Sequence, residues 1–158
     1  MGKLYACVFW IFYFGFLFSQ QTDSIYLDVR LDSTHHELHV KQEFVLVNQS
    51  QKTLTEVYLH AWANAYSGKL TVLNKIKLQD RKGALHFSER EERGGVDNLI
   101  FTDFESNSVR FQINEREFIR IPLEKPWKKG EIIRLKAEYT VKIPFDAVTR
   151  YGRSDEGN

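Results

Sequence analysis

The chain is organised around Tyr58-Leu-His-Ala-Trp-Ala-Asn-Ala-Tyr66. This stretch follows a long alternating segment and precedes a change to helical spacing. Leu54, Val57 and Leu59 supply apolar bulk at its start, and three alternate alanines let another stretch of backbone come close. Asn64 suits a tight exit from an extended segment. We therefore expect a strand over residues 54–62 that turns a corner into the rest of the chain.

Alternation of apolar and polar residues on both sides of this corner predicts a mostly β fold. Period-two segments precede it at 25–31 and 38–47, and further strands are expected at 84–87, 96–104, 109–113, 118–123 and 133–143. Pro122 and Pro126 are expected to end their strand at edge or exit positions. One short helix is predicted over Leu70–Leu78, where apolar residues recur at helical spacing. About seven to nine short strands with one helix predict an antiparallel β-sandwich or saddle-like curved sheets.

The composition describes one folded domain. The chain has 158 residues, 42% of them hydrophobic, which suffices for one core and is short for a multidomain enzyme. Abundant apolar and aromatic residues exclude a disordered composition. The net charge of +1 gives no electrostatic reason to bind nucleic acid or an anionic membrane. We therefore expect no nucleic-acid partner.

The first twenty residues have the pattern of a secretory signal peptide. A short basic start ending at Lys3 precedes an apolar run from Leu4 to Phe18, and polar residues follow. An uncleaved anchor is the alternative, although a membrane-spanning helix needs about 20 apolar residues. The only cysteine, Cys7, lies inside this run, so the mature chain would have no disulfide. We expect a signal peptide at 1–20, a secreted, periplasmic or cell-envelope location, and no membrane association after cleavage.

The most suggestive metal-like cluster is His35-His36-Glu37-Leu38-His39. His35 and His39 have the spacing of the zinc motif H-E-x-x-H, but His36 stands where that motif has glutamate. The motif also requires a helix, which places both histidines on one face, whereas this segment is predicted to be a turn entering a strand. We interpret these histidines as solvated residues of a strand, with adventitious metal capture as the alternative. No metal ligand is assigned.

Other chemically suggestive side chains are isolated along the chain. His60 and His86 are interpreted as packing residues rather than ligands. Asp97, Asp103 and Glu105 carry carboxylates that general acid–base catalysis uses in pairs, but spacing alone does not bring them together. The sequence shows no Ser/His/Asp pattern and no glycine-rich phosphate loop before a helix. Neither catalytic nor cofactor-binding residues are assigned.

Two further patterns have a structural and a functional interpretation. Trp62 and Trp127, with the many tyrosines and phenylalanines, would suit a sugar-stacking platform, but their alternating positions favour core packing. Asn48-Gln49-Ser50 matches an N-glycosylation sequon, a pattern that also occurs by chance. The charged run Glu89–Arg93 is interpreted as a solvated loop.

Seven stretches occur along the chain in this order: Tyr26–Asp32, His36–Val40, Phe44–Ser50, the corner at 58–66, the predicted helix at 70–78, Glu91–Gly94 and Val141–Pro144 leading to Arg150-Tyr-Gly152. Together they resemble the N-terminal β-domain of bacterial zinc metallopeptidases similar to aminopeptidase N. The resemblance covers nearly the whole predicted mature chain.

The resemblance implies a saddle-like domain that packs on a thermolysin-like catalytic domain and helps to shape its substrate cleft. In that family the zinc motif H-E-x-x-H and the substrate-amine motif G-x-M-E-N lie in the following domain. Neither motif occurs here, where the only methionine is Met1, so no family residue is carried over. The expected organisation is a β-domain over 21–149 and a truncated linker over 150–158. We expect a domain inactive alone, whose partner in cis is the catalytic domain, with zinc only there and peptides as substrates.

Two other functions remain open. A free-standing secreted binding module for carbohydrate or a surface protein is suggested by the aromatic content, and it would use exposed aromatic side chains such as Trp62 or Trp127. An independent metalloenzyme would use His35 and His39.

Overall fold

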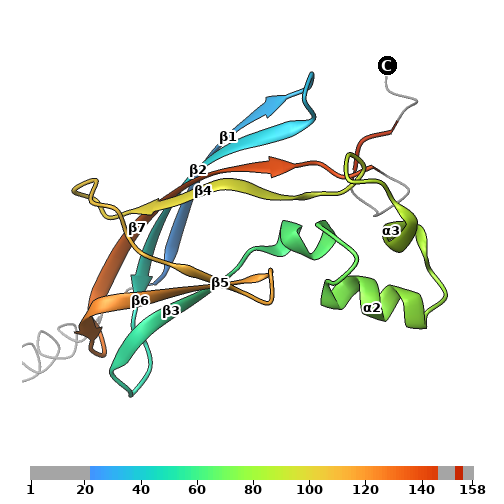
Figure 1. The fold of residues 1–158 in the computed structure, drawn as a ribbon. Helices are drawn as coiled ribbons and strands as arrows, with labels where there is room; N and C mark the ends of the chain where they lie inside the picture. Colours follow the sequence, from blue (N-terminus) through green and yellow to red (C-terminus); the bar gives the residue numbers. More distant parts are fainter. Residues whose placement is uncertain (1–21, 146–151, 155–158) are drawn as a thin grey trace, which may run out of the picture.

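The computed structural model describes residues 22–145 and 152–154, whose strands form two antiparallel sheets (Figure 1). The larger sheet, sheet A, has the order β1-β2-β7-β4, and the smaller, sheet B, has the order β3-β6-β5. Their bounds are β1 Ser24–Asp32, β2 Glu37–Val47, β7 Ile132–Lys142, β4 Gly95–Thr102, β3 Leu54–His60, β6 Phe118–Trp127 and β5 Gln112–Asn114. The predicted fold class, mostly β with antiparallel sheets, is confirmed.

Both predicted terminal segments fall largely outside this description. The signal peptide expected at 1–20 lies outside the described residues, and so does the linker expected at 150–158 apart from residues 152–154. Within the described ranges, no helix is both long enough and apolar enough to span a bilayer.

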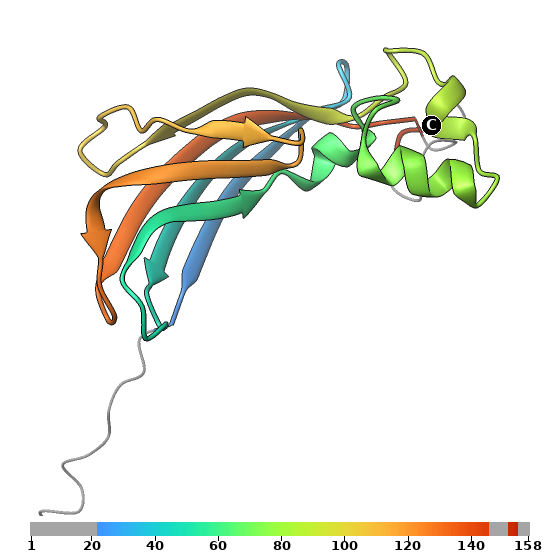
Figure 2. The ribbon, with the colours of Figure 1, turned by 60° about the horizontal axis from the view of Figure 1, so that its bottom comes forward.

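The hydrophobic core lies between the two sheets, which curve together in Figure 2. It forms because alternate residues of each strand share one face, so the apolar half of each alternating segment points at the other sheet. Phe44, Leu135, Ala137 and Phe101 come from sheet A; Val57, Ile119, Ile121 and Trp127 come from sheet B. The turn between β6 and β7 uses Gly130 at a φ of +79°, a conformation that glycine adopts without steric cost.

Asn48 closes one end of this core and is not a surface sequon. It is 2% exposed, and its Nδ2 donates to the carbonyl of Trp127 at 2.7 Å and to that of Lys52 at 2.8 Å. Its Oδ1 accepts from the backbone N–H of Ser50 at 2.9 Å and from the Ser50 hydroxyl. The side chain therefore shapes the turn between β2 and β3 and is inaccessible for glycosylation in the folded protein.

The strand predicted at 84–87 is wrong, because these residues form the short helix α3, Ala84–Phe87. Leu85 is fully buried and packs with Ala65 and Tyr66, while the amide of Phe87 donates to the carbonyl of Gly83 at 3.0 Å. Four residues carry too little periodicity to separate a strand from one helical turn, so tertiary packing decided. The helix predicted at 70–78 is confirmed as α2, Val72–Gln79, with Thr71 as its N-cap.

The prediction that Pro122 ends a strand is also wrong, since β6 continues past it to Trp127, one residue after Pro126. Strand β5 pairs only with residues 118–120 of β6. Beyond that point β6 has no neighbour on the β5 side among the described strands. A proline, which has no N–H to donate, is tolerated along a half-paired stretch of this kind.

Candidate binding groove

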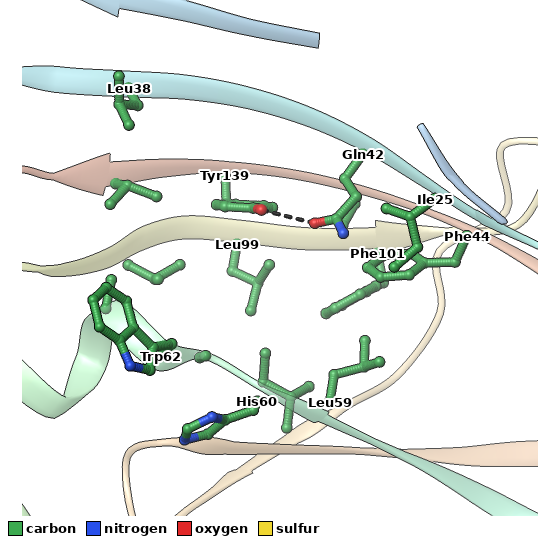
Figure 3. A pocket seen from close by; sticks show the side chains of 16 residues that line it. Ile25, Leu38, Gln42, Phe44, Leu59, His60, Trp62, Leu99, Phe101 and Tyr139 are labelled. Atoms are coloured by element: carbon green, nitrogen blue, oxygen red, sulfur yellow. Dashed lines mark hydrogen bonds between the residues drawn. The ribbon is translucent and has the colours of Figure 1, made fainter. Parts of the chain in front are cut away.

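The two sheets do not cover each other completely, and a cavity of about 500 Å³ opens between them (Figure 3). Sheet A supplies Ile25, Leu38, Gln42, Phe44 and Tyr139 to its wall, among others. The opposite wall includes Leu59, His60 and Trp62, at the end of β3 and the start of the next element. The volume falls within the usual range for ligand pockets, about 300–1,000 Å³. We call this cavity the groove.

Strand β1 extends the wall of the groove into solvent. Opposite residues of antiparallel neighbours share a face, so Leu27 lies on the same face as Gln42, and Ile25 on the same face as Phe44. Ile25, Leu27, Val29 and Leu31 alternate along β1 and are 49–60% exposed. Alternation of this kind is typical of a strand with one buried face and one exposed face. About half of the surface of each of these four side chains is exposed to solvent, and we call this face of β1 the open face.

One polar pair lies on the sheet A wall of the groove. The hydroxyl of Tyr139 donates to Oε1 of Gln42 at 2.7 Å, across neighbouring strands β7 and β2 (Figure 3). Burial raises the pKa of the Tyr139 hydroxyl above its ordinary value, because desolvation disfavours the phenolate. The hydroxyl therefore stays protonated at neutral pH and can hold the Gln42 amide in place.

The position of Gln42 in the groove was not predicted from the sequence, although the pattern of β2 contains a signal for it. Along β2 the apolar face runs Leu38, Val40, Gln42, Phe44, and glutamine is its only interruption. A polar side chain at a core-facing position needs a hydrogen-bond partner or a ligand. The tyrosine that supplies this partner lies 97 residues further along the chain, a pairing that single-strand patterns do not predict.

The corner forms the mouth of the groove. Strand β3 ends at His60, and the 3-10 helix η2, Trp62–Tyr66, follows it, so the predicted corner is present with a strand two residues shorter than expected. Asn64 holds it in place: its Nδ2 donates to the carbonyl of Arg116 at 2.8 Å, and its Oδ1 accepts from the amide of Val96 at 2.7 Å. The alternate alanines of this stretch are all buried, which permits the close approach that they predicted.

Asn64 also secures a strained turn. Glu115 and Arg116, at the centre of the β5–β6 hairpin, have φ values of +49° and +67°. Two consecutive positive φ angles are typical of type I′ turns, where glycine, asparagine and aspartate are preferred. Non-glycine residues in that region are maintained when their surroundings over-determine them. Here the carbonyl of Arg116 accepts from Asn64, and the carbonyl of Glu117 accepts from the Ala61 amide at 2.7 Å.

His60 and Trp62 lie at the rim of the groove. The His60 ring stacks on Phe118 with centroids 5.1 Å apart, and its Nε2 lies 3.5 Å from Oε2 of Glu117. The second carboxylate oxygen of Glu117 is buried without a hydrogen bond to any described residue. Trp62 is 51% exposed and meets Tyr66 edge to face. The rim therefore combines exposed aromatic surface with one imidazole–carboxylate pair.

The histidine cluster is placed in a turn and at the start of β2. His35 Nδ1 lies 2.9 Å from Oδ2 of Asp32, and this hydrogen bond lowers the pKa of Asp32 to about 2 and raises that of His35. His36 has a φ of +55°, and His39 lies on β2 with its Nδ1 3.5 Å from Thr140 Oγ1. The residues described here contain no group of three His, Cys, Asp or Glu side chains that would hold a metal ion. They do not fit a zinc site.

The candidate carboxylates do not converge on the groove. Asp103 shapes the loop after β4: it accepts from the amides of Glu105 and Asn107 and from Asn107 Nδ2, all within 2.9 Å. The Asn107 side chain, followed by its amide, lowers the pKa of Asp103. Asp97 lies on β4, beside a separate small cavity near Gly94 and Gly95.

The remaining candidates have structural partners. Trp127 is 7% exposed and donates from Nε1 to the carbonyl of Glu131, so it belongs to the core and is not part of an aromatic platform. His86 packs edge to face on Phe87, with its Nδ1 3.3 Å from Asn74 Nδ2. Arg93, in the run interpreted as a solvated loop, donates to the hydroxyl and carbonyl of Ser88 after α3.

Comparison with known proteins identifies no family. No family model matches the sequence, and no curated protein matches it either.

Proposed function

We propose that this chain is a non-catalytic β-domain of a secreted zinc metallopeptidase of the aminopeptidase N type, which packs on the catalytic domain and helps to form its substrate cleft. The observation that carries the proposal is the groove with its open face. An apolar surface of this kind, continuous from β1 into the space between the sheets, is the form that an interdomain contact takes when one partner is absent.

A second apolar surface supports the proposal. Helix α2 presents Val72 and Ile76 to solvent at 47% and 50% exposure, and Phe87 of α3 is 76% exposed. In contrast, Asn74 on the inner side of α2 is fully buried. A helix that meets water normally has the reverse arrangement, with its apolar stripe toward the core. Covering this outer stripe with a neighbouring domain would restore the usual pattern.

The sequence resemblance supplies the class of the partner, and the chemistry of the described residues suits a supporting role. The described residues do not fit a zinc site. We therefore propose that the catalytic domain holds the metal and carries out the zinc-dependent steps of peptide hydrolysis. This chain would supply shape, through the groove wall and the rim at Trp62 and His60.

Affinity capture from the native organism tests this proposal. The tagged protein is expected to recover an aminopeptidase activity that a zinc chelator abolishes. Leu27→Asp, which places a charge on the open face, should lose the activity, whereas Tyr26→Asp should retain it because Tyr26 lies on the opposite face of the same strand. Both side chains are similarly exposed, at 59% and 62%. Recovery of no chelator-sensitive peptidase, or equal recovery by both variants, would contradict the proposal.

A free-standing binding module is the second candidate, and one observation favours it. Trp62 is half exposed at the rim of the groove, where an indole ring can stack on a sugar. Glycan-array binding that Trp62→Ala abolishes would support this function. Trp127→Ala is not informative, because Trp127 is a core residue.

A further inference from the structure

Strand β1 has a free outer edge. Among the described strands it pairs only with β2, through an uninterrupted register from Ser24↔Val45 to Asp32↔Glu37. It is therefore a long and regular edge, whose unpaired backbone N–H and C=O groups form a template for another strand.

The other sheet edges are interrupted in ways that discourage pairing. Strand β4 has a register shift between Asp97 and Ile100, with Asn98 at a φ of +55°. Strand β3 has a shift between Leu54 and Glu56. Strand β5 is three residues long. Bulges and short edge strands are the usual protections against edge-to-edge association, and β1 has neither.

We propose that β1 pairs antiparallel with β1 of a second copy of this chain, with Val29 opposite Val29 of that copy. A two-fold axis perpendicular to the sheet reverses the strand and its edge while keeping the two faces of the sheet on the same sides. Residues of one face must then lie opposite residues of the same face. The open faces of both copies become neighbours within one continuous sheet.

The charges of β1 favour this register over the two neighbouring ones. With Val29 on the two-fold axis, Asp28 of each copy lies opposite Arg30 of the other, which forms two identical ion pairs. Moving the axis to Asp28 places two aspartates opposite each other, and moving it to Arg30 places two arginines opposite each other. Like charges directly opposite destabilise antiparallel pairs, whereas opposite charges stabilise them. Within β1–β2, Asp28 lies opposite Lys41 and Arg30 lies opposite His39, but neither the Asp28 nor the Arg30 side chain forms a hydrogen bond or ion pair with another described residue.

Apolar contacts reinforce this register. Leu27 of each copy lies opposite Leu31 of the other, beside the central valine pair, so the exposed side chains of the open face cover one another across the new strand pair. One strand pair buries less surface than a permanent dimer does. We therefore expect a reversible dimer whose population rises with protein concentration.

Sedimentation analysis of the purified protein, from micromolar concentration up to about 1 mM, tests the pairing. The wild type should change from monomer to dimer over this range. Asp28→Arg places an arginine opposite Arg30 in both pairs, and Arg30→Asp places an aspartate opposite Asp28 in both pairs, so each variant alone should remain monomeric. An equimolar mixture of the two should form a heterodimer, because every charge then lies opposite its complement. The mixture distinguishes lost pairing from lost folding.

Matched charge changes elsewhere serve as controls. Asp97→Arg on the opposite edge of the sheet and Arg110→Asp in an exposed loop should dimerise like the wild type. A wild type that stays monomeric at 1 mM, dimers unaffected by either β1 variant, or a mixture that stays monomeric would each overturn the proposal. Asp28 and Arg30 lie on the face opposite the open face, so both variants retain the surface proposed for the catalytic domain. Capture of the peptidase and self-association can therefore fail independently.

Discussion

Replacing Asn64 by alanine is expected to destabilise the protein strongly, because this one amide joins three segments. It removes the donor to the Arg116 carbonyl and the acceptor for the Val96 amide, at 2.8 and 2.7 Å. The Asn64 side chain is buried, and water has little access to these groups from its side. The change also removes one of the contacts that hold the strained β5–β6 turn.

The magnitude follows from the two orphaned partners. Leaving a buried N–H unsatisfied costs about 1–3 kcal/mol, and losing an ordinary hydrogen bond to a more accessible carbonyl costs about 0.5–1.5 kcal/mol. The expected loss in the free energy of unfolding is therefore about 2–4 kcal/mol. For a chain of this size that corresponds to a decrease in Tm of roughly 5–15 °C.

Urea denaturation followed by circular dichroism measures the effect, with the midpoint expected to fall and the slope to stay constant. Asn107→Ala is the matched control, because the side-chain amide of Asn107 donates a hydrogen bond to Asp103 in an exposed loop. This control should cost less than about 0.5 kcal/mol, as exposed polar contacts do. If Asn64→Ala is equally mild, the Asn64 amide does not hold the corner in place.

Three further predictions use other observations. In an NMR titration the pKa of His35 should lie above its ordinary 6.5, and it should return toward 6.5 in the Asp32→Asn variant. The stabilisation linked to His35 is complete below pH 6.5 and is lost as the pH rises through the raised pKa. The stabilisation linked to Asp32 is complete above pH 3.8 and is lost as the pH falls toward the Asp32 pKa of about 2 in the folded protein. When the protein is secreted from a glycosylating host, intact-mass measurement should show that Asn48 carries no glycan. Asn48→Ala should lower the free energy of unfolding in urea by about 2–4 kcal/mol, because buried groups lose their hydrogen bonds to Asn48. Tyr139→Phe should cost about 1 kcal/mol in the same assay, because Gln42 loses its partner in the groove; an unchanged midpoint would show that water replaces it.

Strands β2 and β7 were predictable because one face of each is more buried than the other. Alternation from Leu38 to Phe44 and from Ile133 to Tyr139 placed β2 and β7 within two residues of their observed bounds. Where a segment was too short to show a period, as at Ala84–Phe87, prediction failed. Where half of a strand lost its neighbour, as in β6 after residue 120, the proline rule gave the wrong end point.

The groove was harder to predict than the strands, because it depends on how far one sheet extends beyond the other. Alternation assigns Leu27 and Val29 to the core face correctly, but it does not reveal whether a second layer covers that face. The turn at Glu115 and Arg116 has the same limitation. Its sequence lacks the glycine that marks type I′ turns, and it is held by Asn64, about fifty residues earlier in the chain.

Helix α2 connects these observations to the proposed role. A helix that faces solvent gains little from exposing Val72 and Ile76, and it incurs a cost by burying Asn74, whose Oδ1 has no hydrogen-bond partner among the described residues. The open face of β1 has the same mismatch between its side chains and its surroundings. Two separate elements with apolar side chains turned outward are consistent with surfaces that pack against a further layer of protein. An Ile76→Asp variant compared with Lys75→Asp separates this interpretation from chance: only the former should weaken capture of the peptidase, and equal recovery by both would exclude α2 from the contact.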